Sequence, residues 1–72
     1  MSKLPVSKQF GQNLKRLRLK KSLSQGDISR RLDVDRSYVS NLENGRMNPT
    51  LSTIKKLAKA LNTSADKLLK RV

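Results

Sequence analysis

The fold is decided by residues 23–43, which read LSQGDISRRLDVDRSYVSNLE. Two short helical patterns lie in this stretch, and about three residues separate them. Counted from Gln25 as position one, the apolar residues that would anchor both helices fall at positions 4, 8, 10, 15 and 18: Ile28, Leu32, Val34, Val39 and Leu42. Ser29 is small enough to lie where two helices cross. This spacing predicts a helix-turn-helix over about residues 25–43.

Polar residues mark the ends of these two helices. Ser24 and Asp27 form a Ser-x-x-Asp pattern, a variant of the capping box, which predicts the start of the first helix. Asp33-Val34-Asp35 is typical of a turn, and Asp35 is placed to cap the second helix. Asn44-Gly45 predicts its end, because glycine adopts the left-handed backbone without a steric penalty.

Helical periodicity continues on both sides of this stretch. Phe10, Leu14 and Leu17 recur at i, i+4 and i+7 and predict a helix over about residues 7–21. Thr50 is placed to cap a helix with a clean apolar stripe, made of Leu51, Ile54, Leu57, Ala58 and Leu61. Ser64 is placed to cap a last short helix. The sequence therefore predicts one all-α domain of five helices over residues 1–72.

The charge of the chain is large and unevenly distributed. Seventeen Lys and Arg against five Asp and Glu give a net charge of +12. Residues 1–22 contribute seven basic groups and no acid, residues 23–50 are neutral, and residues 51–72 contribute a net +5. The natural partners of such a chain are polyanions, namely DNA, RNA or an anionic membrane.

Composition excludes several classes of protein. There is no Cys and no His, which excludes disulfides, zinc fingers and His-based catalysis, and no metal or other cofactor is predicted. One Glu and the absence of a Gly-rich phosphate loop argue against an enzyme, and no small-molecule ligand is indicated. No apolar run approaches a membrane span or a signal peptide, so we expect a cytoplasmic protein. One Tyr and one Phe are too few for a typical RNA-stacking platform.

The stretch from Leu23 to Arg46, with Asn48-Pro49-Thr50-Leu51 and Leu57-Ala58-Lys59-Ala60-Leu61, resembles the phage repressor/Cro type of helix-turn-helix domain. The resemblance covers about residues 8–70. It implies a lambda-repressor-like fold and a bacterial or phage-encoded transcription regulator. Such a regulator binds double-stranded DNA as a homodimer, with a recognition helix of about residues 36–43 in the major groove. The short chain is also similar to restriction–modification controller proteins, and small prophage regulators look much the same.

The resemblance also implies residue roles. The residues expected to read base edges are Arg36, Ser37, Ser40 and Asn41. Those expected to contact phosphates are Ser24, Gln25, Tyr38, Asn44 and Arg46. Ser40 could instead contact a phosphate, and Tyr38 could contact a base or cover the core. Arg18 and Glu43 are expected to form an ion pair that positions the recognition helix. The family's usual Gly in the turn is replaced here by Asp33.

Assembly and alternative functions stay open at this point. Leu68, Leu69 and Val72 could close the core, but we favour a dimer contact, because so small a domain gains stability from a partner chain. One alternative function is a protein-interaction module, such as an antitoxin or coactivator, that uses the fourth and fifth helices. Another is non-specific binding of polyanions. A membrane-surface helix is least favoured, because the apolar stripe of the first helix is narrow.

Overall fold

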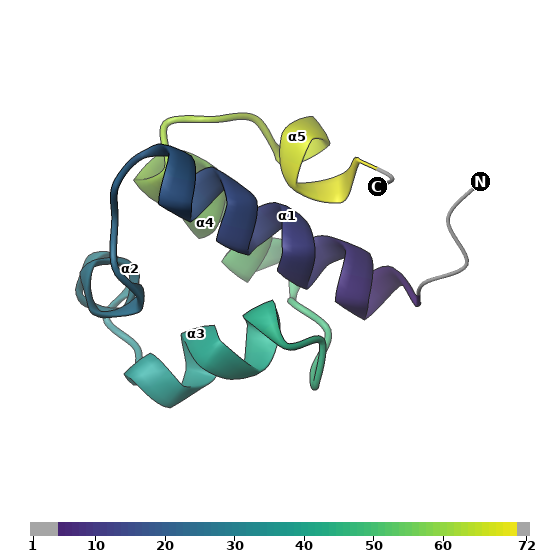
Figure 1. Cartoon of the computed structure of the whole chain (residues 1–72), viewed down its shortest axis with the longest axis horizontal. Coiled ribbons are helices and arrows are strands. Elements are labelled where there is room, and N and C mark those ends of the chain that lie inside the picture. Colours follow the sequence, from purple (N-terminus) through teal and green to yellow (C-terminus); the bar gives the residue numbers. More distant parts are fainter. Residues whose placement is uncertain (1–4, 71–72) are drawn as a thin grey trace.

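The computed structural model describes residues 5–70, and it contains five α-helices and no strand in that range. The helices are α1 (Val6–Lys20), α2 (Gln25–Leu32), α3 (Arg36–Glu43), α4 (Leu51–Ala60) and α5 (Ala65–Leu69) (Figure 1). This confirms the predicted all-α class with five helices. The first helix begins and ends one residue earlier than predicted. Within the described residues, no helix has both the length and the apolar character of a membrane span.

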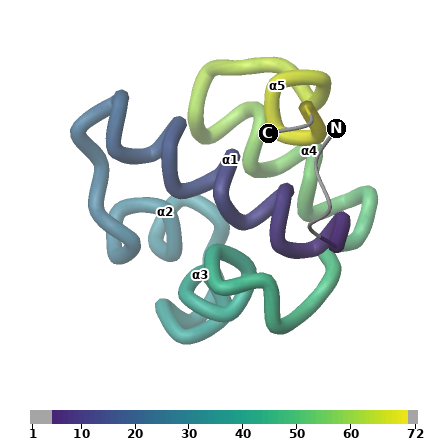
Figure 2. The backbone as a smooth tube through the Cα atoms, turned by 45° about the vertical axis from the view of Figure 1, so that its right-hand side comes forward, coloured from purple at the N-terminus to yellow at the C-terminus, as the bar shows by residue number. Residues whose placement is uncertain are grey.

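Helix α1 lies at the centre of the molecule. It packs against α3 on one side and α5 on the other, while α2 packs against α3 and α4 (Figures 1 and 2). One core joins all five helices and consists of Phe10, Leu14, Leu17, Ile28, Leu32, Val39, Leu42, Ile54, Leu57, Leu61 and Leu68. The predicted anchors of the helix-turn-helix belong to this core, except Val34, which is half-buried against it.

The helix starts follow the sequence signals only in part. Ser24 forms the predicted capping box, since its Oγ accepts from the Asp27 N–H and its own N–H donates to Asp27 Oδ2. The Thr50 hydroxyl accepts from the Thr53 N–H at 3.0 Å, as predicted. Asp35 and Ser64 occupy the predicted N-cap positions, but neither side chain makes a cap bond. Both side chains are exposed, and their helices close the first turn through backbone bonds instead.

Four of the helices end in one backbone arrangement. A residue with positive φ follows each of α1 to α4, and the next N–H donates to a carbonyl five residues earlier. The four residues are Ser22, Asp33, Asn62 and Gly45, with φ of 58°, 57°, 52° and 70°. Only glycine adopts this conformation without a steric penalty. The ends of α1, α2 and α4 therefore carry steric strain, because their positive-φ residues are Ser22, Asp33 and Asn62.

Candidate nucleic-acid interface

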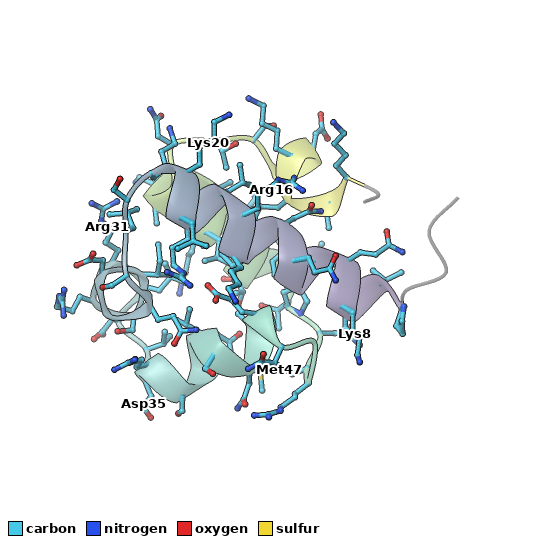
Figure 3. All side chains as sticks on the ribbon, in the orientation of Figure 1. Lys8, Arg16, Lys20, Arg31, Asp35 and Met47 are labelled. Carbon is cyan, nitrogen blue, oxygen red and sulfur yellow. The ribbon has the colours of Figure 1, made fainter. Side chains whose placement is uncertain are left out.

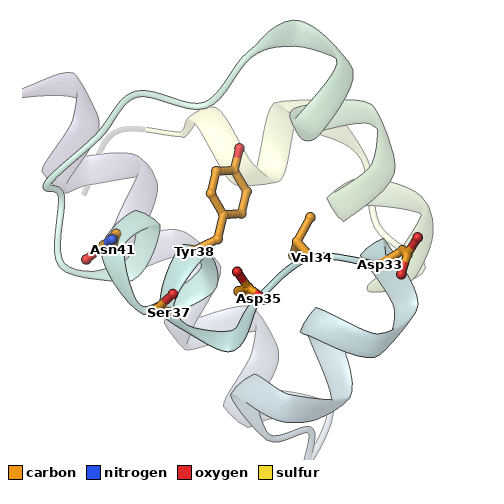
Figure 4. A pocket seen from close by; sticks show the side chains of 6 residues that line it. All are labelled: Asp33, Val34, Asp35, Ser37, Tyr38 and Asn41. Carbon is orange, nitrogen blue, oxygen red and sulfur yellow. The ribbon is translucent and has the colours of Figure 1, made fainter.

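The four predicted base-reading residues share the outer face of α3. Arg36 and Ser37 are exposed, and neither side chain makes a hydrogen bond or ion pair within residues 5–70. Ser37 and Asn41 lie one turn apart on the same side of the helix (Figure 4). Ser40 and Asn41 are half-buried. The structure thus presents polar groups on one face of a helix whose other face lies in the core.

Two predicted phosphate-contacting residues follow α3 and touch the outer face. Asn44 Nδ2 donates to Ser40 Oγ at 3.3 Å, and an Arg46 N–H donates to Asn41 Oδ1 at 3.4 Å. Both distances are long for hydrogen bonds and indicate weak contacts. The Asn44 and Arg46 side chains are exposed, so a ligand could displace either contact readily.

Beside this face lies an open concavity of about 610 Å³, which runs from the turn between α2 and α3 along α3 (Figure 4). Its lining consists of Asp33, Val34, Asp35, Ser37, Tyr38 and Asn41. The two carboxylates make the floor near the turn acidic. Such a surface favours hydrogen-bond donors over phosphate oxygens, because like charges placed together are destabilising.

Tyr38 points from α3 toward α4 and away from the outer face (Figure 4). Its ring packs against the core, and its hydroxyl lies 3.0 Å from Thr53 Oγ1. Thr53 in turn lies 2.9 Å from the Thr50 hydroxyl that caps α4. The structure gives Tyr38 the role of a core cover that bridges two helices, and its phosphate contact stays a prediction.

The start of α2 presents free backbone donors. The N–H groups of Gln25 and Gly26 have no acceptor within the described residues, while that of Asp27 is bound by Ser24. Hydrogen bonds from Ser24, the backbone bond above all, hold the pKa of Asp27 below its usual range, and Arg30 contributes in the same direction. The Asp27 carboxylate lies 2.5 Å from the Arg30 guanidinium. The N–H groups of Gln25 and Gly26 therefore stay available to an anion, while the Asp27 carboxylate offsets part of the positive charge of the helix start.

The predicted ion pair between Arg18 and Glu43 is present and buried. The guanidinium donates from Nε to Oε2 at 2.6 Å and from Nη2 to Oε1 at 3.0 Å, and the two side chains are only 9% and 2% exposed. The hydrogen bond to Glu43 raises the pKa of Arg18, and burial opposes this shift. Arg18 also donates to the Leu23 carbonyl at 2.9 Å. The pair therefore ties the end of α3 to α1 and to the segment before α2.

Gln25 belongs to the same network. Its Nε2 donates to Glu43 Oε1 at 3.0 Å, which uses one of its two amide hydrogens. The second hydrogen stays available for the predicted phosphate contact. The start of α2 and the end of α3 thus share one carboxylate.

Gly11 is a site-positioning residue that the sequence interpretation missed. A Cβ atom built on it would lie 2.5 Å from the Glu43 carbonyl oxygen and closer still to that of Leu42. No side chain fits between α1 and the end of α3, so only glycine allows this approach. The available signal was its place in the sequence, since Gly11 shares a helix face with Leu14 and Arg18 at i+3 and i+7.

The three predicted dimer contacts differ in where they lie. Leu68 is fully buried in the core of its own chain, so its assignment to a dimer surface is corrected. Leu69 is 49% exposed, and Val72 lies outside the described residues. Leu51, predicted as part of the core stripe, is 82% exposed, because the first turn of α4 extends beyond the core. Leu51 and Leu69 border an apolar groove of about 730 Å³ between α4 and α5, whose other lining residues are Ser52, Ile54, Lys55, Lys56 and Ala65.

Most of the positive charge lies outside the helix-turn-helix. Residues 23–50 carry four basic and four acidic groups. Figure 3 shows Arg16 and Lys20 projecting from α1 on the side opposite α3, with Asp35 at the start of α3. The outer face of α3 therefore combines hydrogen-bonding groups with little net charge.

The chain matches known proteins over nearly its whole length. A helix-turn-helix family model matches residues 14–68. The control protein C.BamHI of Bacillus amyloliquefaciens is 39% identical over 61 residues, which cover 83% of this chain and 75% of that protein. The crystal structure of the restriction–modification controller protein C.AhdI from Aeromonas hydrophila is similar, with a TM-score of 0.82 at 42% identity, covering 86% of this chain and 94% of that one. The hypothetical transcription factor NHTF from Neisseria gives 0.86 at 35% identity, covering 99% and 86%.

Proposed function

Because this chain belongs to the helix-turn-helix family and is a DNA-binding transcriptional regulator, we propose that it acts as a homodimer on a two-fold-symmetric operator. Each protomer places α3 in the major groove, and half-sites lie about 10–10.5 base pairs apart. Similarity to two control proteins favours a controller role among such regulators. The regulator would work in the cytoplasm, where bacterial and phage operators lie.

The observation that carries the proposal is the polar outer face of α3, whose side chains have either no partner or only a weak one within residues 5–70. Arg36 has no partner in residues 5–70, and a guanidinium suits the O6 and N7 acceptors of guanine. The Asn41 amide suits the N6 and N7 positions of adenine, and it needs to give up only the 3.4 Å contact with Arg46. Ser37 and Ser40 complete the set with hydroxyls that can donate or accept.

Phosphate contacts would flank this face. The free N–H groups of Gln25 and Gly26 form an anion site at the start of α2, and the second amide hydrogen of Gln25 adds a donor. The Ser24 hydroxyl accepts in the capping box, so its hydrogen is available to the same phosphate. After α3, the exposed side chains of Asn44 and Arg46 reach the backbone of the adjacent groove wall.

The groove between α4 and α5 supports the homodimer. Exposed Leu51 and Leu69 border it, and its walls are mainly apolar. Exposed apolar patches on small domains mark interaction surfaces. A second copy is the occupant we propose, because a two-fold-symmetric operator needs two reading helices related by the same symmetry.

The test is selection from a random duplex pool at about 150 mM salt, followed by titration of the enriched duplex against scrambled DNA. We expect a two-fold-symmetric motif and a specificity ratio of about 10³ or more. Arg36→Ala and Asn41→Ala should each weaken the free energy of binding to the enriched duplex by about 1–3 kcal/mol. Each should also relax the sequence preference at one base position.

Lys20→Ala is the matched control, since it removes a cation on the side of α1 opposite α3 (Figure 3). It should weaken binding to all sequences slightly and alter no base preference. No enriched motif, with affinity that collapses as salt rises, would replace the proposal with non-specific polyanion binding. If Arg36→Ala and Asn41→Ala leave binding unchanged while a substitution of Leu69 abolishes it, the result would favour a protein-interaction module.

A further inference from the structure

Asn13 is a polar residue buried completely between α1 and α5. The exposed fraction of its side chain is 0%. Its Nδ2 donates to the Leu68 carbonyl at 2.9 Å and to the Lys70 carbonyl at 2.5 Å. These two bonds use both hydrogens of the amide nitrogen. Because the last carbonyls of a helix lack partners inside the helix, Asn13 caps the end of α5 from a different helix.

Helix α5 is short and has few other contacts that fix its position. It has five residues, a length at which an isolated helix does not form in water. Ser64 makes no side-chain bond at its start, and Leu68 is the buried residue within it. The position of α5 against α1 therefore depends on the buried Leu68, on the half-buried Ala65 that packs against the core, and on the two bonds from Asn13.

The side-chain oxygen of Asn13 lowers the stability that its two hydrogen bonds to α5 provide. Asn13 Oδ1 is buried and has no hydrogen-bond partner within the described residues. A buried acceptor without a partner is unfavourable, and an apolar side chain of similar size would avoid that loss. The two donor bonds, in contrast, impose a defined direction on the end of α5, which apolar contact alone does not do.

We infer that Asn13 is a positioning residue for dimerisation. The inference rests on the homodimer proposed above. Leu69 directly follows the buried Leu68, and it forms one wall of the apolar groove whose other wall is on α4. Asn13 does not line the groove, so it acts through α5 by setting where Leu69 lies relative to Leu51.

The test combines Asn13→Leu with Leu69→Ala in a double-mutant cycle on the dimer dissociation constant, measured by sedimentation equilibrium. Asn13→Leu keeps the bulk and removes both bonds and the orphan oxygen. We expect it to weaken the dimer about tenfold or more, and we expect it to add little once Leu69 is already alanine. Gln12→Leu, at the exposed neighbouring position on α1, is the matched control and should leave the dimer constant unchanged.

Two further readouts separate positioning from simple stabilisation. Amide hydrogen exchange of Asn13→Leu should accelerate in α5 and stay unchanged in α3. Affinity for a single half-site should change less than twofold, because Arg18 and Gly11 still hold α3. Should Asn13→Leu destabilise the fold too far for these measurements, Asn13→Ser, which keeps one donor, should give an intermediate dimer constant.

Three results would overturn the inference. An unchanged dimer constant in Asn13→Leu would remove it, and so would full additivity with Leu69→Ala. A wild-type chain that stays monomeric at all concentrations would remove both this inference and the homodimer proposal, and in that case Leu69→Ala would have no effect on association. If the wild-type chain dimerises and Leu69→Ala weakens the dimer, the homodimer proposal stands whatever the effect of Asn13→Leu.

Discussion

Helices α3 and α5 lie on opposite sides of α1, and each is fastened to it by one buried polar side chain. Arg18 holds the end of α3 through a charged, two-point contact to Glu43, and Gln25 joins the same carboxylate. Asn13 holds the end of α5 through two neutral bonds and leaves its own oxygen without a partner. The attachment of α3 therefore pairs its buried polar atoms, while that of α5 leaves one buried acceptor unpaired. Both attachments fix the direction of a helix end, but the charged one does so with its polar atoms paired, while the neutral one leaves an acceptor unpaired.

The largest effect should come from breaking the charged attachment. Arg18→Met leaves the Glu43 carboxylate buried with only the Gln25 amide as partner, and a buried charge without its counter-ion is strongly unfavourable. We expect the free energy of unfolding in urea to fall by about 3–5 kcal/mol. The double variant Arg18→Met, Glu43→Leu should recover much of this loss. A single variant as stable as wild type would show that the pair contributes nothing net.

The next effect concerns the space between α1 and α3. Gly11→Ala forces a Cβ atom against two backbone carbonyls that cannot move without shifting α3, so we expect a loss of about 1–3 kcal/mol. Gly26→Ala is the matched control, because its Cβ would meet only the far end of Arg30 at 3.3 Å and the Ser24 hydroxyl at 3.6 Å. Improved helix propensity should make it more stable by up to about 1 kcal/mol. If thermal unfolding shows that both variants change stability in the same direction, the close approach of α1 and α3 at Gly11 would be contradicted.

A smaller gain should come from the turn between α2 and α3. Asp33 adopts φ of 57° and places a negative charge at the end of α2, where the helix dipole disfavours it. Asp33→Gly removes the steric strain and the charge, and we expect a gain of about 0.5–1 kcal/mol after the entropy of the unfolded glycine is counted. Gly45→Ala, at φ of 70° and beside Lys8, should move stability in the opposite direction. Urea titration of both variants measures the contrast.

The smallest effect comes from the Asp27 capping box, and it should be lost at acid pH. The folded-state pKa of Asp27 is lowered, so its contribution to stability is fully present above its unfolded pKa and is lost as pH falls through the folded value. The stability advantage of wild type over Asp27→Asn should therefore shrink steadily below about pH 4. Thermal unfolding of both proteins between pH 6 and 2.5 gives the comparison. An advantage independent of pH would exclude the charged capping box as its source.

The sequence predicted the features that depend on local spacing or on the family resemblance. The ends of α2 and α3, the core anchors and the Arg18–Glu43 pair follow from spacing, from cap signals and from a family resemblance. Leu51 was expected in the core and is exposed, because the first turn of α4 extends beyond the core. Leu68 was expected at a dimer surface and is buried, because the side of a five-residue helix that faces the core depends on how the other helices pack. Gly11 and Asn13 were missed for a related reason, since each meets its need in a different helix far along the chain.

The outer face of α3 has a consequence for how such regulators diversify. Arg36 and Ser37 make no contact that the fold needs, and Asn41 contributes one weak contact to Arg46. All the attachments of α3 lie on its inner face and at its ends. The outer residues can therefore be exchanged for others without altering the scaffold, and under the base-reading role proposed above such exchanges would change the target sequence and keep the architecture.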